Sequence, residues 1–149
     1  MQFSLAIAAS VLAFTASAAP TTVQTRDIAS GTDQNGSIFM FGDPAGPRQI
    51  LFQSGACGLS TYFANQVDPS MPLVAMPAGV FDQFGAAQNN ALCAKVITMT
   101  NNGVTRQAVV ADRNLSVDNS IDMTLDLWEA FGGHDNDGTL IHGFSWSIN

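Results

Sequence analysis

Charged residues are scarce in this chain, and basic residues are the scarcest. Lys and Arg number 5 against 12 Asp and Glu, which gives a formal net charge of −7, and the sequence pI is about 4.2. A chain this acidic lacks the positive surface that attracts nucleic acid or an anionic membrane, so we expect neither as a partner. Acidity of this degree is also common among proteins secreted into acidic media.

Cysteine is nearly absent as well, with Cys57 and Cys93 as the two examples. In an oxidising compartment an even pair predicts one disulfide. It would close a loop of about 36 residues and stabilise the fold by roughly 3–4 kcal/mol. A zinc site needs more ligands than two distant thiols.

The N-terminus lacks charge. Residues 3–18 are apolar or small, and Ala16-Ser17-Ala18 has the small-x-small pattern that a signal peptidase cleaves. The run is too short to span a bilayer comfortably, so we expect a signal peptide over residues 1–18 and a secreted, extracellular protein. After it the chain has no run of 18 apolar residues, and we expect it to be soluble.

Residues 19–36 are rich in Thr, Gln, Asp, Gly and Asn and show no apolar periodicity. They predict a flexible leader, followed by a single domain over residues 37–149. No internal repeat is visible.

The pattern from Ser37 onward predicts mostly strands. Asn102-Gly103 supplies the two positive φ angles of a type I′ turn, so we expect a hairpin around it. Thr124 is the expected N-cap of a helix whose Leu125, Trp128 and Phe131 share one face. The expected strands are residues 38–41, 49–52, 72–76, 95–100, 104–111 and 140–148; the expected helices are a single turn within 77–85 and a helix over 125–131. Short strands with brief helices favour a mainly β fold, a small barrel or a sandwich.

Two aspartates at the ends of predicted elements are candidate site residues. Asp112, followed by Arg113 and Asn114, ends an apolar strand, and Asp122 precedes the predicted helix. Converging Asp residues are suited to acid/base catalysis or to anchoring a polar ligand. Both also have structural interpretations: Asp112 in a turn or paired with Arg113, and Asp122 bound to backbone amides ahead of the helix.

Several segments occur in a familiar order. They are Gly55-Ala56-Cys57-Gly58, Leu73-Val74-Ala75-Met76, Leu92-Cys93-Ala94-Lys95, Ala111-Asp112-Arg113, Ile121-Asp122-Met123-Thr124 and Phe144-Ser145-Trp146-Ser147-Ile148. Over roughly residues 37–149 the chain resembles the rare-lipoprotein-A-like (RlpA-like) double-psi β-barrel family, especially its small secreted fungal members. That superfamily also contains barwin, expansins and barwin-like endoglucanases.

The resemblance implies a six-stranded double-psi β-barrel with short peripheral helices, a polar groove and a Cys57–Cys93 bridge. Asp122 matches the residue that is the general acid in hydrolytic relatives and an essential polar residue in expansins. Asp112 matches the preceding strand-end Asp of the same groove. No aspartate matches the general base of the endoglucanases: Asp43 is nearest, but Gly42-Asp43-Pro44 is typical of a turn. The second cysteine pair of many fungal relatives is absent, as are the acidic and histidine residues of the lytic transglycosylases.

The remaining candidate residues have simpler interpretations. Trp128 and Trp146 lie in core patterns, whereas Tyr62 and Phe63 are better candidates for exposed aromatic residues. His134, Asp135, Asp137 and His142 suggest metal ligands, but Asp135-Asn136-Asp137-Gly138 is chiefly a turn signature without the later Glu of a calcium loop. We expect no metal and no cofactor. Asn35 and Asn114 head glycosylation sequons.

Three classes of function remain open. The first, which we favour, is a monomeric, non-hydrolytic protein that binds or modifies cell-wall polysaccharide through Asp112, Arg113, Asn114, Asp122 and Tyr62. The second is a protein-binding module, such as an inhibitor of papain-like cysteine proteases or a secreted effector. The third is a glycan-cleaving enzyme with Asp122 as general acid, but inverting hydrolysis also needs a carboxylate base at a suitable distance, and none matches.

Overall fold

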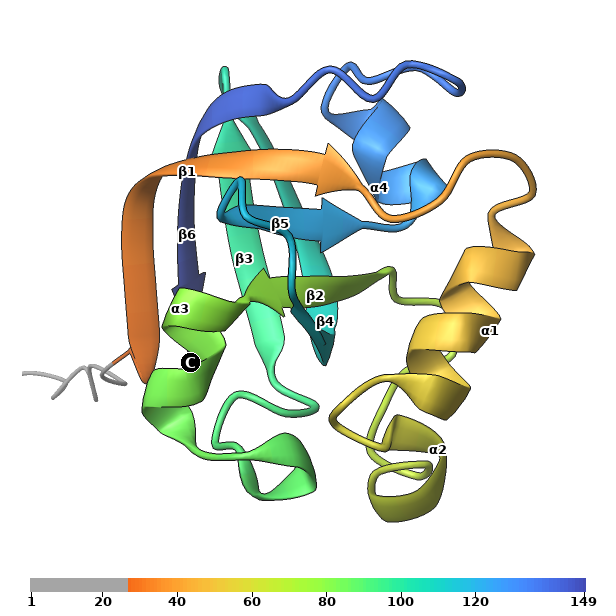
Figure 1. Cartoon of the computed structure of the whole chain (residues 1–149), viewed down its shortest axis with the longest axis vertical. Coiled ribbons are helices and arrows are strands. Elements are labelled where there is room, and N and C mark those ends of the chain that lie inside the picture. The colour runs from red at the N-terminus through yellow and green to blue at the C-terminus, as the bar shows by residue number, and fades with distance from the viewer. Residues whose placement is uncertain (1–26) are drawn as a thin grey trace, which may run out of the picture.

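The computed structural model describes residues 27–149, which form a closed, mainly β barrel with short helices at its periphery (Figure 1). The six strands of this described part are β1 (Ala29–Ile38), β2 (Leu73–Pro77), β3 (Val96–Asn101), β4 (Val104–Asn114), β5 (Ser120–Met123) and β6 (Ile141–Ile148). The helices are α1 (Ala45–Ser54), α2 (Leu59–Tyr62), α3 (Ala78–Phe81) and α4 (Leu125–Ala130), with single 3-10 turns η1 (Asp82–Phe84) and η2 (Ala87–Asn89).

Neighbouring strands follow the order β1-β5-β2-β4-β3-β6, and β6 pairs with β1 to close the barrel. The β1–β5 and β2–β4 pairs are parallel and the others antiparallel. This mixed six-stranded barrel confirms the predicted fold class and is consistent with a double-psi barrel. The predicted signal peptide and its cleavage site lie outside the described residues.

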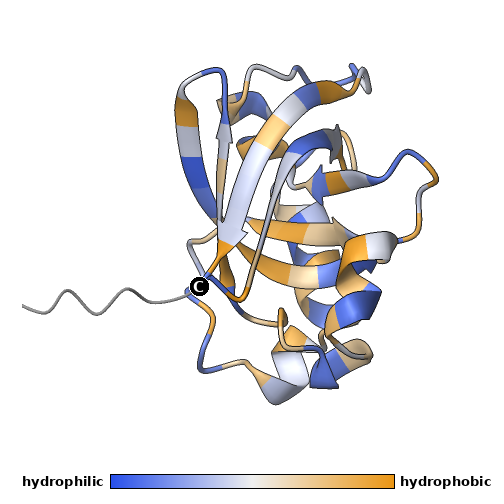
Figure 2. Ribbon diagram, turned by 90° about the vertical axis from the view of Figure 1, so that its left-hand side faces the viewer, coloured by the Kyte–Doolittle hydropathy of each residue, from blue (hydrophilic) through white to orange (hydrophobic). Residues whose placement is uncertain are grey.

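The barrel core is made from alternating residues of the strands. Phe144, Trp146 and Ile148 of β6 are buried, while the residues between them are more exposed. All five residues of β2 are buried, because α1 and α3 pack against this strand. Figure 2 shows mainly orange, hydrophobic residues on the strands that run horizontally across the middle of the view, whereas the broad strand in front of them is paler. No helix among residues 27–149 has the length and apolar character needed to cross a membrane.

Local chemistry predicted several elements correctly. Asn102 and Gly103 have φ angles of 46° and 80° and join β3 to β4, with Asn101 opposite Val104, as a type I′ hairpin requires. The helical turn before Gly85, the strand β2 and the final strand β6 also lie where the sequence predicts them. Cys57 and Cys93 form the predicted disulfide.

Three expectations were wrong. Residues 49–52 belong to helix α1 rather than to a strand, with Pro47 and Leu51 buried one helical turn apart. Residues 38–41 are not a separate strand, since β1 ends at Ile38. The leader predicted over 19–36 is in part ordered structure: from Ala29 onward it pairs with β6 and then with β5.

The start of α4 also differs in detail. Thr124 occupies the N-cap position, but its side chain makes no capping hydrogen bond. Its hydroxyl is buried and has no partner within the described residues. The backbone carbonyl of Thr124 instead accepts a hydrogen bond from the Trp128 amide at 3.0 Å.

Candidate functional site

The barrel places the two predicted aspartates in one row across four strands. Ser37 of β1 lies opposite Asp122 of β5, Asp122 lies opposite Ala75 of β2, and Ala75 lies opposite Asp112 of β4. The β2–β4 register shifts after Val74, so that Asp112, rather than Ala111, faces Ala75. Paired residues on neighbouring strands project to the same face. The backbones of Asp112 and Asp122 are therefore two strand spacings apart, about 10 Å.

Asp122 is half-buried, and its carboxyl group accepts a hydrogen bond from the Ser37 hydroxyl. The hydroxyl oxygens of Ser37 and Ser120 are 2.5 Å apart, so a serine pair lines one side of this carboxyl group. Burial raises the pKa of Asp122 to about 6. The Ser37 hydrogen bond opposes this rise, the charges of Asp118 and Asp112 add to it, and the Ser120 hydroxyl opposes it. We call Ser37, Ser120 and Asp122 the Asp122 site.

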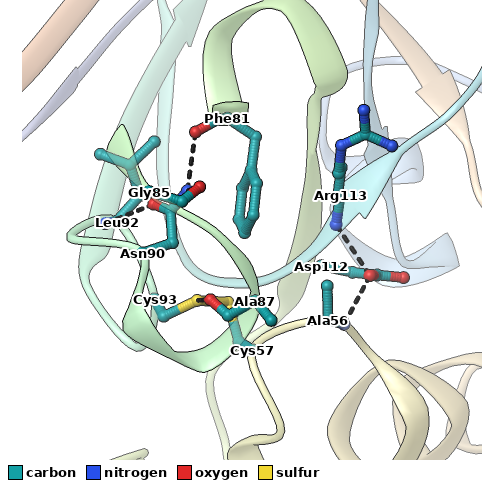
Figure 3. The surroundings of a disulfide bond; sticks show 10 residues. All are labelled: Ala56, Cys57, Phe81, Gly85, Ala87, Asn90, Leu92, Cys93, Asp112 and Arg113. Carbon is teal, nitrogen blue, oxygen red and sulfur yellow. Dashed lines mark hydrogen bonds between the residues drawn. A yellow bond between two sulfur atoms is a disulfide. The ribbon is translucent and has the colours of Figure 1, made fainter. Parts of the chain in front are cut away.

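The Asp112 carboxylate binds backbone amides. One of its carboxylate oxygens, Oδ1, accepts hydrogen bonds from the amides of Ala56 and Arg113, each at 2.7 Å (Figure 3). The next amide, that of Cys57, donates to the carbonyl of Ala111 at 3.1 Å. Gly55 fits here because a Cβ atom would lie 2.5 Å from that same carbonyl oxygen. Asp112 thus holds the disulfide-bearing segment against the end of β4.

Arg113 does not pair with Asp112. Its guanidinium points away from that carboxylate in Figure 3 and binds Asp82 instead, with Nε–Oδ1 and Nη2–Oδ2 distances of 2.6 Å. This pairing lowers the pKa of Asp82 and raises that of Arg113, mainly through the hydrogen bonds between them. The contact joins η1 to the end of β4.

Asn114 is buried and closes the loop between β4 and β5. Its Nδ2 donates to the Ser120 carbonyl at 2.8 Å, and its Oδ1 accepts from the Ser116 amide at 2.8 Å. Asn35, the other sequon asparagine, is half-buried: its Nδ2 donates to the Asp118 carbonyl at 3.0 Å, and its Oδ1 lies 2.7 Å from Nδ1 of His142.

Tyr62 is exposed, as predicted, but it is not brought to the Asp122 site. It ends α2, which packs on α1 and lies well apart from β5 in Figure 1. Phe63 packs partly buried against the core, and Trp128 and Trp146 are buried as predicted. Asp43 accepts a hydrogen bond from the Ala45 amide at 3.0 Å, which agrees with its interpretation as a turn residue.

Two features of this region were missed by the sequence analysis. Ser37 and Ser120 were not candidates, although Ser37 pairs with Asp122 across 85 residues. Leu115 and Val117 are the most exposed large hydrophobic residues of the described chain, at 73% and 104% of reference exposure. Leu115 and Val117 lie within residues 114–119, which are otherwise of turn-forming types. Apolar residues in such a run were the available signal for this second feature.

The fold and the site define a mainly β, six-stranded closed barrel with one half-buried carboxyl group beside two serines. Neither a protein-family profile nor a curated protein sequence matches the chain. Among solved structures, the Streptomyces papain inhibitor is similar with a TM-score of 0.51 and 20% identity, over 82% of this chain and 96% of that one. A mutant expansin of Clavibacter michiganensis in complex with cellohexaose is similar with a TM-score of 0.52 and 16% identity, over 80% of this chain. The match spans half of the expansin chain. At these identities the likeness shows the fold.

Proposed function

We propose that the protein is secreted and binds cell-wall polysaccharide, without cleaving it, through the Asp122 site. The observation that carries this proposal is the half-buried carboxyl group of Asp122 next to the Ser37 and Ser120 hydroxyls. Sugar hydroxyls both donate and accept hydrogen bonds, and a carboxyl group that titrates near pH 6 both accepts and donates in mildly acidic solution. The cellohexaose bound to the structurally similar expansin supports this ligand class.

Among the described residues, the carboxylates that could act as a base near Asp122 already have hydrogen-bond partners. Asp118 accepts hydrogen bonds from Ser116 and Ser120. An inverting mechanism needs a base that takes a proton from the attacking water. Asp112 lies in the same strand row as Asp122, but its Oδ1 already binds two backbone amides. Asp43 is bound within its own turn. These assignments support binding rather than cleavage.

Retention of the protein on insoluble chitin, β-glucan and cellulose tests the proposal. The informative variant is Asp122→Asn, and its matched control is Asp126→Asn, which removes an exposed carboxylate from α4. We expect the wild type and D126N to be retained on at least one polysaccharide, and D122N to bind it about tenfold more weakly, as loss of one hydrogen bond to a charged group implies. No reducing ends should be released. Equal retention of all three proteins would refute the Asp122 site, and reducing ends that vanish in D122N would establish an enzyme.

A second function is supported by a separate observation. The loop over residues 115–119 projects Leu115 and Val117 into solvent, which is typical of a protein contact rather than of a sugar groove. The structural similarity to the papain inhibitor covers 96% of the inhibitor chain and 82% of this one. We therefore propose inhibition of papain-like cysteine proteases as the alternative function, and measuring papain activity against increasing concentrations of the protein tests it.

A further inference from the structure

The loop over residues 115–119 combines exposed apolar side chains with an ordered backbone. Leu115 and Val117 project outward, while the residues that flank the loop, Asn114 and Ser120, are buried. Every other exposed large hydrophobic residue of the described chain stays at or below the 57% of Tyr62. Covering these two side chains with a partner would remove apolar surface from water, which favours association.

Side chains within and below the loop fix its conformation. Asn114 spans the base, donating to the Ser120 carbonyl and accepting from the Ser116 amide. Asp118 accepts hydrogen bonds from the hydroxyls of Ser116 at 2.5 Å and of Ser120 at 2.7 Å, and from the Ser120 amide at 3.1 Å. These contacts hold the loop without strand pairing over residues 115–119.

Strand β1 supports the loop from the side. Asn35 donates to the carbonyl of Asp118 at 3.0 Å, and Gln34 donates to that of Asn119. Asn119 has a φ of 55°, which turns the chain back into β5. Because the loop is ordered before it meets a partner, it loses little conformational entropy on binding.

The exposed side chains of the loop indicate how it would bind. Leu115, Ser116 and Val117 are all exposed, and Ser116 is held in place because its amide donates to Asn114 and its hydroxyl to Asp118. A turn held in one conformation can present two exposed apolar side chains to apolar pockets of a protein cleft without first having to become ordered. The loop carries no basic residue, and the chain is strongly acidic, so an anionic membrane is a poor partner.

We propose that the 115–119 loop is the segment that enters the active-site cleft of a papain-like cysteine protease, where Leu115 and Val117 fill apolar subsites. This inference rests on the second function proposed above and names the residues that would carry it. It assigns the protease a surface distinct from the Asp122 site, although the two are linked through Ser120.

The experiment measures inhibition of papain by the wild type, by the double variant Leu115→Ser/Val117→Ser, and by Ile50→Ser. Ile50 is the matched control because it is an exposed apolar residue on α1. We expect the wild type and I50S to inhibit equally and the double variant to need at least a tenfold higher concentration. The thermal unfolding midpoints of all three should agree, since none of these side chains is buried.

The possible failures are distinguishable. A wild type that leaves papain active overturns both the protease function and the role of the loop. A wild type and a double variant that inhibit equally overturn the role of the loop alone and leave the protease function standing. As a second readout, the double variant should still be retained on polysaccharide like the wild type; a loss of retention with inhibition unchanged would assign the loop to the Asp122 site instead and overturn the inference.

Discussion

Ser37 and Asp122 lie side by side on parallel strands, and the serine hydroxyl donates a hydrogen bond to the carboxyl group of the aspartate. This bond stabilises the carboxylate and opposes the rise in pKa that burial causes. Replacing Ser37 with Ala should therefore raise the pKa of Asp122 above its value of about 6. An NMR titration of the Asp122 side-chain carbon measures this directly, with Ser30→Ala on the same strand as the control. A pKa that stays the same or falls in S37A would contradict the assigned bond.

The raised pKa of Asp122 makes stability depend on pH. The folded protein binds this proton more tightly than the unfolded chain does, so the contribution of Asp122 to the free energy of unfolding falls as pH rises from about 4 through about 6. Asp122→Asn removes this dependence. We expect D122N to exceed the wild type by on the order of 1–2 kcal/mol at pH 7 and to match it near pH 4.

Urea denaturation at the two pH values measures that difference. Asp126→Asn, on the exposed side of α4, is the control and should show little change between them. If D122N were less stable than the wild type at pH 7, the charged carboxylate would stabilise the folded protein, contrary to this expectation.

Asp112 should behave as a structural residue. Asp112→Ala leaves the amides of Ala56 and Arg113 without their acceptor and should lower the free energy of unfolding by roughly 2–4 kcal/mol. Asp112→Asn keeps a carbonyl oxygen and should cost less. Polysaccharide retention per folded molecule should not change in either variant. If stability were unchanged and polysaccharide retention were lost, Asp112 would be a ligand-binding residue rather than a structural one.

The contrast between these two aspartates shows how far the sequence could predict the site. The resemblance identified Asp112 and Asp122 as a pair, and the strand register aligns both with Ala75 of β2, in one row across β4, β2 and β5. The partners that distinguish the two aspartates could not be predicted, because Ser37 and Ala56 come from distant segments. Ser37 reaches Asp122 from 85 residues away, and Ala56 reaches Asp112 from 56 residues away.

The fold was predictable where local chemistry decides it. Asn102-Gly103 specified its hairpin because few other residues accept two positive φ angles. The first half of β1 gave no such signal, since its polar residues lack apolar alternation. The two glycines of β1 explain why. A Cβ on Gly31 would lie 2.6 Å from the Trp146 indole, and one on Gly36 would lie 2.5 Å from the Phe144 ring and closer still to the Met123 side chain of β5. Aromatic side chains from β6, together with Met123 of β5, occupy the space beside these glycines.

The disulfide should contribute substantially to stability. Cys57 and Cys93 are 36 residues apart and leave no free cysteine within the described residues. The double variant Cys57→Ser/Cys93→Ser should lose roughly 3–4 kcal/mol of unfolding free energy on the chain-entropy estimate. Urea denaturation of the wild type with and without reductant should show a similar loss. Titratable thiol in the native protein would contradict the pairing.

The Asn114 sequon should carry no glycan in the native protein. Its Nδ2 atom, the point of attachment, is buried and donates to both the carbonyl and the hydroxyl of Ser120, at 2.8 and 3.2 Å. A glycan there would break these bonds and open the base of the 115–119 loop. Mass spectrometry of glycopeptides from protein secreted by a glycosylating host should find Asn114 unmodified. Full occupancy in a folded protein would show that the loop opens at its base, and it would remove the ordered conformation on which the proposed protease contact depends.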